Sequence, residues 1–207
     1  MKFTFIDLFS GVGAFNMALT SLGGTCLFSS EIDRNCSNVY KENFHLDSLK
    51  DIRSVVKGDL PEGFDVLCAG FPCQPFSKAG KQEGFEDPSE GTLFFQIERI
   101  LKIHRAKFIL LENVRNLVSM DNGYTWKIIC NKLTQLGYRL NSKPLILSPH
   151  QFGVPQLRER VYIVGKYDPD NIDKPLNIVF NNLKSKENND NNNNNNVDNN
   201  SIEINND

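Results

Sequence analysis

The chain has 207 residues and a formal net charge of −2, and 40% of its residues are hydrophobic. This length suits one domain with a buried core. The near-neutral charge argues against a free-standing nucleic-acid-binding protein, because such proteins are usually basic. No apolar run is long enough to span a membrane, and the N-terminus lacks the regions of a signal peptide. We therefore expect a cytoplasmic protein with no membrane partner.

The chain contains five cysteines, an odd number without the spacing of a disulfide framework or a zinc site. They are Cys26, Cys36, Cys68, Cys73 and Cys130. We therefore expect no structural metal. Cys73 differs from the others because Pro72, Gln74 and Pro75 surround it and interrupt regular structure, which predicts an exposed thiol.

Apolar residues recur along the chain at strand spacing and at helix spacing in turn. In chain order, the pattern predicts a strand over 4–9, a helix over 15–22, a strand over 26–30, a helix over 34–43, a strand over 66–69, a helix over 92–103, a strand over 108–111, a helix over 125–136, and late strands over 138–147 and 161–164. We expect the two late strands to be antiparallel neighbours. The alternation indicates an α/β fold with helices on both faces of the sheet.

A glycine turn, Ser10-Gly11-Val12-Gly13, joins the first strand to the first helix, and Gly23-Gly24 ends that helix. Glycines at such a turn let a ligand approach the backbone closely. Glu31 ends the second strand, where an acid can bind ribose hydroxyls, and Asp51 lies where an acid can accept a bond from an adenine amino group. The pattern favours an adenosine-type cofactor. The alternatives are a plain tight turn and a solvated loop acid.

Two reactive side chains follow core strands. Cys73 comes after the strand over 66–69, and Glu112 comes after the strand over 108–111. A thiolate is a strong nucleophile, and a carboxylic acid of raised pKa can donate a proton to a ring nitrogen. The pair therefore suggests covalent catalysis on an electron-poor ring. A cysteine hydrolase is an alternative, but it requires a histidine beside Cys73, and the three histidines lie in no supporting motif.

Arg158 and Arg160 alternate on an extended segment and should face the same side. Guanidinium groups suit a carbonyl oxygen, a carboxylate or a phosphate. A solvated strand entry with Glu159 as a local partner is the alternative.

We expect residues 1–168 to form the cofactor-binding and catalytic domain, 169–180 a linker, and 181–207 an asparagine-rich disordered tail. Residues 74–90 are predicted to be a long functional loop.

Together these stretches resemble the DNA (cytosine-5) methyltransferases, especially the bacterial restriction–modification type. The resemblance covers about residues 3–165 and includes DLFSGVGAF, GFPCQPFS, GKQEGFEDPSEGTLFF, ENV and QFGVPQLRERVYIVG. It implies a Rossmann-like methyltransferase sheet that uses S-adenosylmethionine and acts on cytosine in duplex DNA.

The resemblance also implies roles for individual residues. Cys73 would add to carbon 6 of cytosine, Glu112 would protonate or hydrogen-bond N3, and Arg160, supported by Arg158, would hold the O2 side of the base. The implied cofactor-binding residues are Phe9, Gly11, Gly13, Phe15, Glu31, Ile32, Asp51, Ile52 and Leu93. The implied DNA-binding residues are Ser77, Lys78, Lys81 and Gln156. The target base would be flipped out of the duplex to reach the thiol.

The sequence departs from the family after Gly165, where we find neither a target-recognition region nor the family's C-terminal motifs. The fold is therefore expected to be incomplete at its C-terminus. One interpretation is the catalytic half of a split enzyme that needs a second subunit; the other is an inactive remnant that binds only cofactor or a partner. A tRNA cytosine-5 methyltransferase is the alternative within the same chemistry. The expected location is the nucleoid in a bacterium and the nucleus in a eukaryote.

Overall fold

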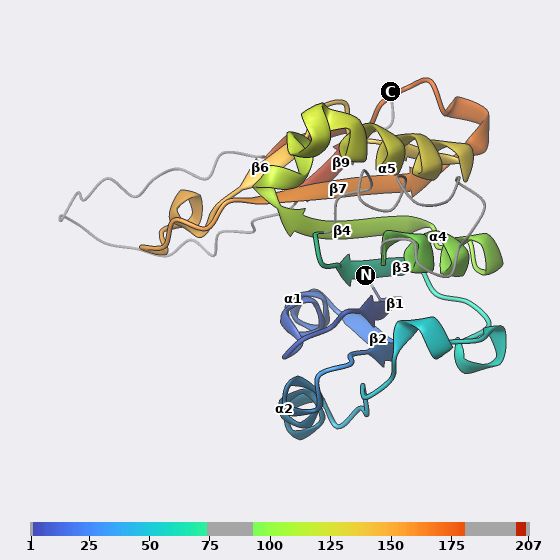
Figure 1. The fold of residues 1–207 in the computed structure, drawn as a ribbon, viewed down its shortest axis with the longest axis vertical. Helices are drawn as coiled ribbons and strands as arrows, with labels where there is room; N and C mark the ends of the chain where they lie inside the picture. Colours follow the sequence, from blue (N-terminus) through green and yellow to red (C-terminus); the bar gives the residue numbers. More distant parts are fainter. Residues whose placement is uncertain (1, 74–92, 181–201, 206–207) are drawn as a thin grey trace.

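The computed structural model describes residues 2–73, 93–180 and 202–205. Within them, seven strands form one sheet in the order β2-β1-β3-β4-β7-β5, with β6 also paired to β7 (Figure 1). These strands are β1 Phe3–Leu8, β2 Gly24–Ser30, β3 Val66–Gly70, β4 Phe108–Val114, β5 Tyr138–Leu140, β6 Leu145–Leu147 and β7 Arg160–Tyr167. The helices are α1 Ala14–Ser21, α2 Arg34–Phe44, α4 Phe94–Ile103 and α5 Tyr124–Gln135.

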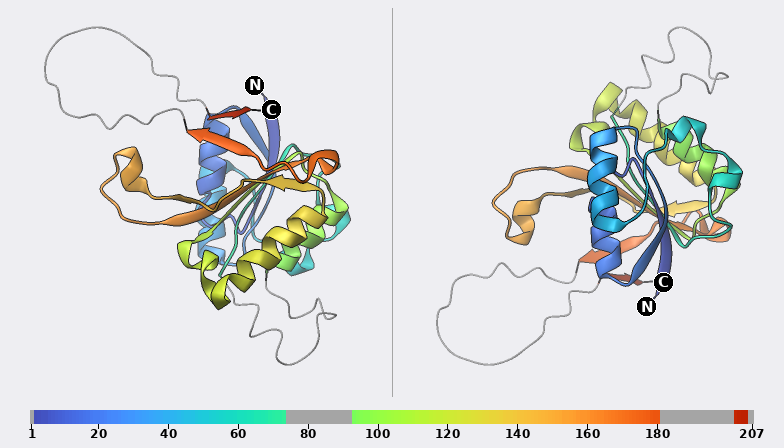
Figure 2. Two further views of the ribbon diagram at one scale, coloured as in Figure 1. Left: turned by 90° about the horizontal axis from the view of Figure 1, so that it is seen from above. Right: turned by 90° about the horizontal axis from the view of Figure 1, so that it is seen from below.

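The sheet is mixed. Strands β2, β1, β3 and β4 are parallel to one another, whereas β7 runs antiparallel to β4, β5 and β6. The predicted antiparallel pairing of the late strands is thus confirmed. In the two views of Figure 2, α1 and α2 cover one face of the sheet, and α4 and α5 cover the other. The predicted α/β fold with helices on both faces is therefore confirmed.

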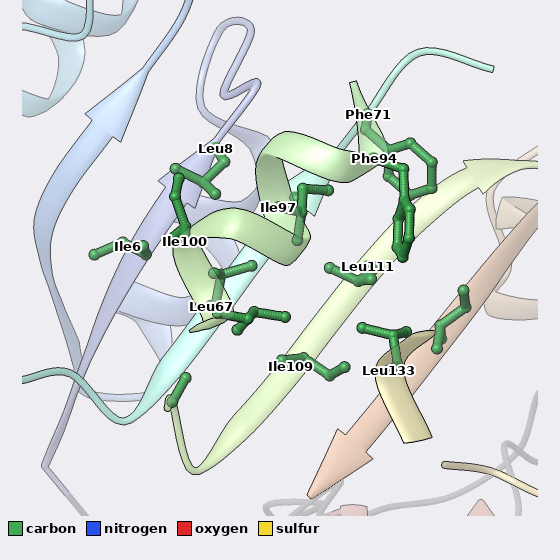
Figure 3. Close-up of a cluster of buried hydrophobic side chains, with 14 of the residues drawn as sticks. Ile6, Leu8, Leu67, Phe71, Phe94, Ile97, Ile100, Ile109, Leu111 and Leu133 are labelled. Atoms are coloured by element: carbon green, nitrogen blue, oxygen red, sulfur yellow. The ribbon is translucent and has the colours of Figure 1, made fainter. Parts of the chain in front are cut away.

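The main hydrophobic core lies between the sheet and the α4–α5 layer. Ile6, Leu67 and Ile109 point from successive strands toward Ile97 and Ile100 of α4 (Figure 3). All five of these side chains are fully buried, so this layer fixes the strand positions from β1 to β4. None of the described helices is long and apolar enough to cross a membrane.

The late strand predicted over 138–147 is wrong as a continuous element, because it is divided into β5 and β6. Between them, the side chain of Asn141 takes the place of a strand carbonyl: its Oδ1 accepts a hydrogen bond from Val164 N at 2.9 Å. Leu140 pairs with Gly165 and Leu145 with Tyr162, so four residues oppose two of β7. Such an excess of residues bulges the strand and interrupts its pairing.

Other boundaries also differ from the sequence prediction. The sequence predicts that Gly23-Gly24 ends the first helix. In the structure Gly24 is already the first residue of β2, and Gly23 alone lies between β2 and Leu22, the residue after α1. Strand β8, Asn177–Phe180, lies in the expected linker, and it pairs antiparallel with β9, Ile202–Asn205, in the expected tail. The domain boundaries at 168 and 180 stay predictions.

The turn from β1 to α1 uses left-handed backbone at Phe9 (φ 55°), Gly11 (φ 53°) and Gly13 (φ 95°). A Cβ atom at Gly13 would lie 2.1 Å from a ring carbon of Phe44, the last residue of α2, whereas a Cβ atom at Gly11 would meet nothing within 4 Å. Gly13 therefore lets α2 pack against the start of α1. At Gly11 only the backbone conformation calls for glycine.

These two glycines form a matched pair for a stability test. Gly11→Ala should lower the free energy of unfolding by about 1 kcal/mol, because alanine resists a positive φ. Gly13→Ala should cost about 1–3 kcal/mol more, because its methyl group overlaps the Phe44 ring. Urea unfolding measures both values. In a Phe44→Ala background the difference between the two variants should shrink, and equal losses in the unmodified background would contradict this explanation.

Candidate active site

The predicted reactive residues gather where parallel strands end, which is the usual ligand-binding edge of an α/β sheet. Gly70, the last residue of β3, pairs with Glu112 of β4. A Cβ atom at Gly70 would lie 3.4 Å from Glu112 Oε2 and 3.9 Å from Phe15 Cε2. Gly70 thus separates the predicted acid from an aromatic residue of the predicted cofactor site. The two predicted sites are adjacent.

Glu112 and Arg160 form an ion pair across β4 and β7, with Arg160 Nε 2.8 Å from Glu112 Oε1. Burial raises the pKa of Glu112 above its ordinary value, while the charges of Arg160 and Arg158 act in the opposite direction. Both arginines therefore act on Glu112, as expected from their alternation. The Glu159 carboxylate pairs with Arg115 at 2.6 Å, while the backbone carbonyl of Glu159 accepts a 2.9 Å hydrogen bond from Arg160 Nη1.

The prediction of an exposed thiol is wrong, because Cys73 is half-buried against the hydrophobic core, and its Sγ lies 3.8 Å from the sulfur of Met120. Burial raises the pKa of this thiol, and the nearby Asp121 carboxylate raises it further. Asp121 and Asn122 both have left-handed backbone, at φ 53° and 55°, so a strained turn stands beside the thiol. In this environment the thiol keeps its proton until another group promotes its loss.

Asn113 was assigned no role from the sequence, although it fixes the approach to Cys73. Its Nδ2 donates a 2.8 Å hydrogen bond to the carbonyl oxygen of Phe71, two residues before the cysteine. Asn113 is 3% exposed and shares the inward face of β4 with Ile109 and Leu111. A polar residue at an inward position of an apolar strand was the signal that could have identified it.

Glu31 lies beside the glycine turn. Its Oε2 accepts a 2.8 Å hydrogen bond from Gly11 N, and its Oε1 accepts bonds of 2.8 Å from Ile32 N and Asp33 N. A carboxylate offers about four acceptor positions, so one remains on Oε2 for a ligand hydroxyl. Asp33 caps α2 by accepting from Asn35 N and Cys36 N. Ile32 is 66% exposed beside this carboxylate.

The other predicted cofactor residues have different surroundings. Asp51 is engaged by its neighbour Arg53, whose Nη2 lies 2.6 Å from Oδ2, and this contact lowers the pKa of Asp51. Ile52 is buried, and its carbonyl oxygen accepts a bond from Arg99 of α4 at 2.9 Å. Phe9 and Leu93 are half-buried against the core.

Ser77, Lys78 and Lys81, and the predicted loop over 74–90, lie outside the described residues. Gln156 and Arg158 are exposed on the segment between β6 and β7, which extends away from the sheet in Figure 1.

The described residues contain no group of acidic, histidine and cysteine side chains that could hold a metal ion. The interactions recorded at Cys73 involve Met120 and Asp121 and no histidine, so they do not support the cysteine hydrolase alternative.

Comparison with known proteins gives consistent matches. The chain is 51% identical over 166 residues to the type II methyltransferase M.HpaII of Haemophilus parainfluenzae, a match that covers 79% of this chain and 46% of that protein. It is 46% identical over 160 residues to M.HhaI of Haemophilus parahaemolyticus, covering 77% of this chain and 48% of that protein. The chain therefore spans about half the length of these curated relatives.

Solved structures agree on the fold. A Spodoptera frugiperda DNMT2 mutant superposes with a TM-score of 0.65 at 25% identity, covering 81% of this chain and 50% of that one. The sequence model of the family described as "C-5 cytosine-specific DNA methylase" matches residues 3–206, which is nearly the whole chain. The chain belongs to the C-5 cytosine-specific DNA methylase family.

Proposed function

We propose that this chain carries the catalytic centre of an enzyme that transfers a methyl group from S-adenosylmethionine to carbon 5 of cytosine in duplex DNA. The observation that supports this most is the ion pair of Glu112 with Arg160 at the strand ends, where Glu112 is also the partner of Gly70, three residues before Cys73. A Cβ atom at Gly70 would also lie 3.9 Å from Phe15 of the proposed cofactor site. A nucleophile, a buried acid and a cation are the groups that covalent catalysis on a cytosine ring requires.

S-adenosylmethionine fits the residues present. The tight turn leaves open space beside Gly11, Glu31 keeps an acceptor position for a ribose hydroxyl, and Ile32 offers an exposed apolar surface for an adenine ring. The proposed binding residues are the nine named above, from Phe9 to Leu93. When bound, this cofactor supplies an electrophilic methyl group.

The chain's own residues would prepare the cytosine. The Cys73 thiolate forms a bond to carbon 6, while Glu112 donates a proton or a hydrogen bond to N3, so that electron density moves to carbon 5. Arg160 stays hydrogen-bonded at the base, with Arg158 as its support. Burial raises the pKa of Glu112, which favours the protonated form that donation to N3 requires. After carbon 5 has bonded to the methyl group, solvent water takes the carbon-5 proton and the bond between Cys73 and carbon 6 breaks. N3 returns any proton it received to Glu112, and the ring is restored.

We further propose that this chain works with the other half of the family sequence, since it spans about half the length of its relatives. That half would supply target recognition as a second subunit. Ser77, Lys78, Lys81 and Gln156 are the proposed DNA contacts of this chain. The alternatives are tRNA as the substrate, and a remnant that binds only cofactor or a partner.

A methyl-transfer assay distinguishes these functions. The chain, together with a polypeptide carrying the other half of the family sequence, is incubated with methyl-labelled cofactor and with either duplex DNA or tRNA. We expect label in cytosine of the DNA. Transfer to tRNA alone would favour the tRNA alternative, and cofactor binding without transfer to either would favour the remnant.

Cys73→Ser should lower methyl transfer by at least about a thousandfold, because a hydroxyl is a far weaker nucleophile than a thiolate. Cys130→Ala is the matched control, since Cys130 lies on α5 and burial alone accounts for its raised pKa. The control should retain transfer, while cofactor binding should be retained in both variants. Full activity in Cys73→Ser would contradict the mechanism.

The pKa of Glu112 should depend on the charges of Arg160 and Arg158. Arg160→Met should raise the pKa of Glu112 further, and Arg158→Met should raise it less, because the effect of Arg160 is the larger. Carbon-detected NMR titration of labelled glutamate side chains measures this shift. Arg115→Met is the control, since Arg115 pairs with Glu159. An unchanged or lowered pKa in Arg160→Met would show that the ion pair does not control Glu112.

A further inference from the structure

Asp7 of β1 comes three residues before the glycine turn, and it has no part in the mechanism above. Its side chain is 0% exposed. In the strand register it sits beside Ser29 of β2 and Cys68 of β3, both of which are buried. A carboxyl group is the least expected side chain at such a position, because burial of its charge carries a large free-energy cost.

Neither carboxyl oxygen of Asp7 completes a hydrogen bond with the described residues. The Asn16 backbone and the Tyr40 hydroxyl lie near enough to lower its pKa, but burial outweighs them and raises that pKa to about 8. The other titratable groups that face Asp7 are Glu31 after β2, Cys26 of β2, Tyr40 of α2 and Cys68 of β3. Full burial without a hydrogen-bond partner among the described residues therefore favours the protonated form of Asp7 at neutral pH.

Glu31 links Asp7 to the cofactor site. Its negative charge is close enough to raise the pKa of Asp7, and the same carboxylate accepts the hydrogen bond from Gly11 N. Two neighbouring carboxylates that are both ionised repel each other. Glu31 is also the more accessible of the two, so repulsion would displace it from Gly11 rather than move the buried Asp7.

We propose that Asp7 is a positioning residue that must keep its proton for Glu31 to hold the glycine turn in the form that binds the cofactor. Loss of the proton places a second negative charge under the turn and moves Glu31 away from Gly11. The effect on cofactor affinity rests on the proposed function. Protonation of Asp7 does not, because it depends on the folded chain alone.

Affinity for S-adenosylhomocysteine, measured by calorimetry from pH 6.5 to 9.5, tests the consequence. In the unmodified chain the dissociation constant should rise about tenfold between pH 7 and pH 9, because only the protonated fraction binds and the pKa is about 8. Asp7→Asn should remove this rise. Asp47→Asn, a change at an exposed loop acid, should leave it in place and corrects for titration of the ligand's amino group. Affinity that increases with pH, or a rise retained in Asp7→Asn, would overturn the proposal.

Thermal unfolding tests the proton without any ligand. The folded chain keeps a proton that the unfolded chain loses above about pH 4, so the stability that Asp7 contributes falls from about pH 4 to about pH 8 and then stays level. The Tm of Asp7→Asn relative to the unmodified chain should therefore rise over this range. The rise should be smaller in a Glu31→Gln background.

The two measurements separate the proposals. Failure to bind the cofactor at every pH would count against the proposed function, while the Tm comparison would still decide the state of Asp7. A Tm difference that is constant from pH 5 to pH 8, or is unaffected by Glu31→Gln, would overturn the role of Asp7.

Discussion

The register of β3, β4 and β7 is the constraint on which the site depends. It places Gly70 beside Glu112 and Val114 opposite Arg160, so the acid and the cation meet at one edge of the sheet. A slip of one residue would turn Glu112 into the core, because successive strand residues face opposite sides. The buried side chains that alternate with the site residues, Leu111 and Ile163 among them, hold the register. Core packing and chemistry thus occupy opposite faces of the same strands.

The electrostatics of the site favour an unreactive state before the substrate binds. Burial raises the pKa of both Cys73 and Glu112, so the nucleophile and the acid are biased toward their protonated forms. Among the described residues the cations near Glu112 are Arg160 and Arg158, and the charge that acts on Cys73 is that of Asp121. Activation of the thiol must therefore come with the substrate or with residues beyond those described.

Local patterns in the sequence predicted much of this arrangement. The apolar runs before Cys73 and Glu112 identified the strands. The glycine turn and Glu31 were also identified, and in the structure Gly11 N donates a hydrogen bond to the Glu31 carboxylate. The division of β5 from β6 was missed because it depends on a contact between Asn141 and Val164, which lie 23 residues apart. The roles of Asn113 and Asp7 were missed for the same reason. Each is a buried polar residue in a largely apolar strand, and its role depends on Phe71 or Glu31, which are distant in sequence.

The central claim is that Cys73 bonds to carbon 6 of a cytosine held by Glu112 and Arg160. Duplex DNA with 5-fluorocytosine at the target position tests it directly, because fluorine blocks the proton loss that would release the enzyme. Mass spectrometry of the chain, combined with the other half of the family sequence and the cofactor, should find one covalent adduct per chain, located on the peptide that contains Cys73. An adduct on another cysteine, or methyl transfer to unmodified DNA with no adduct on the fluorinated duplex, would contradict the account.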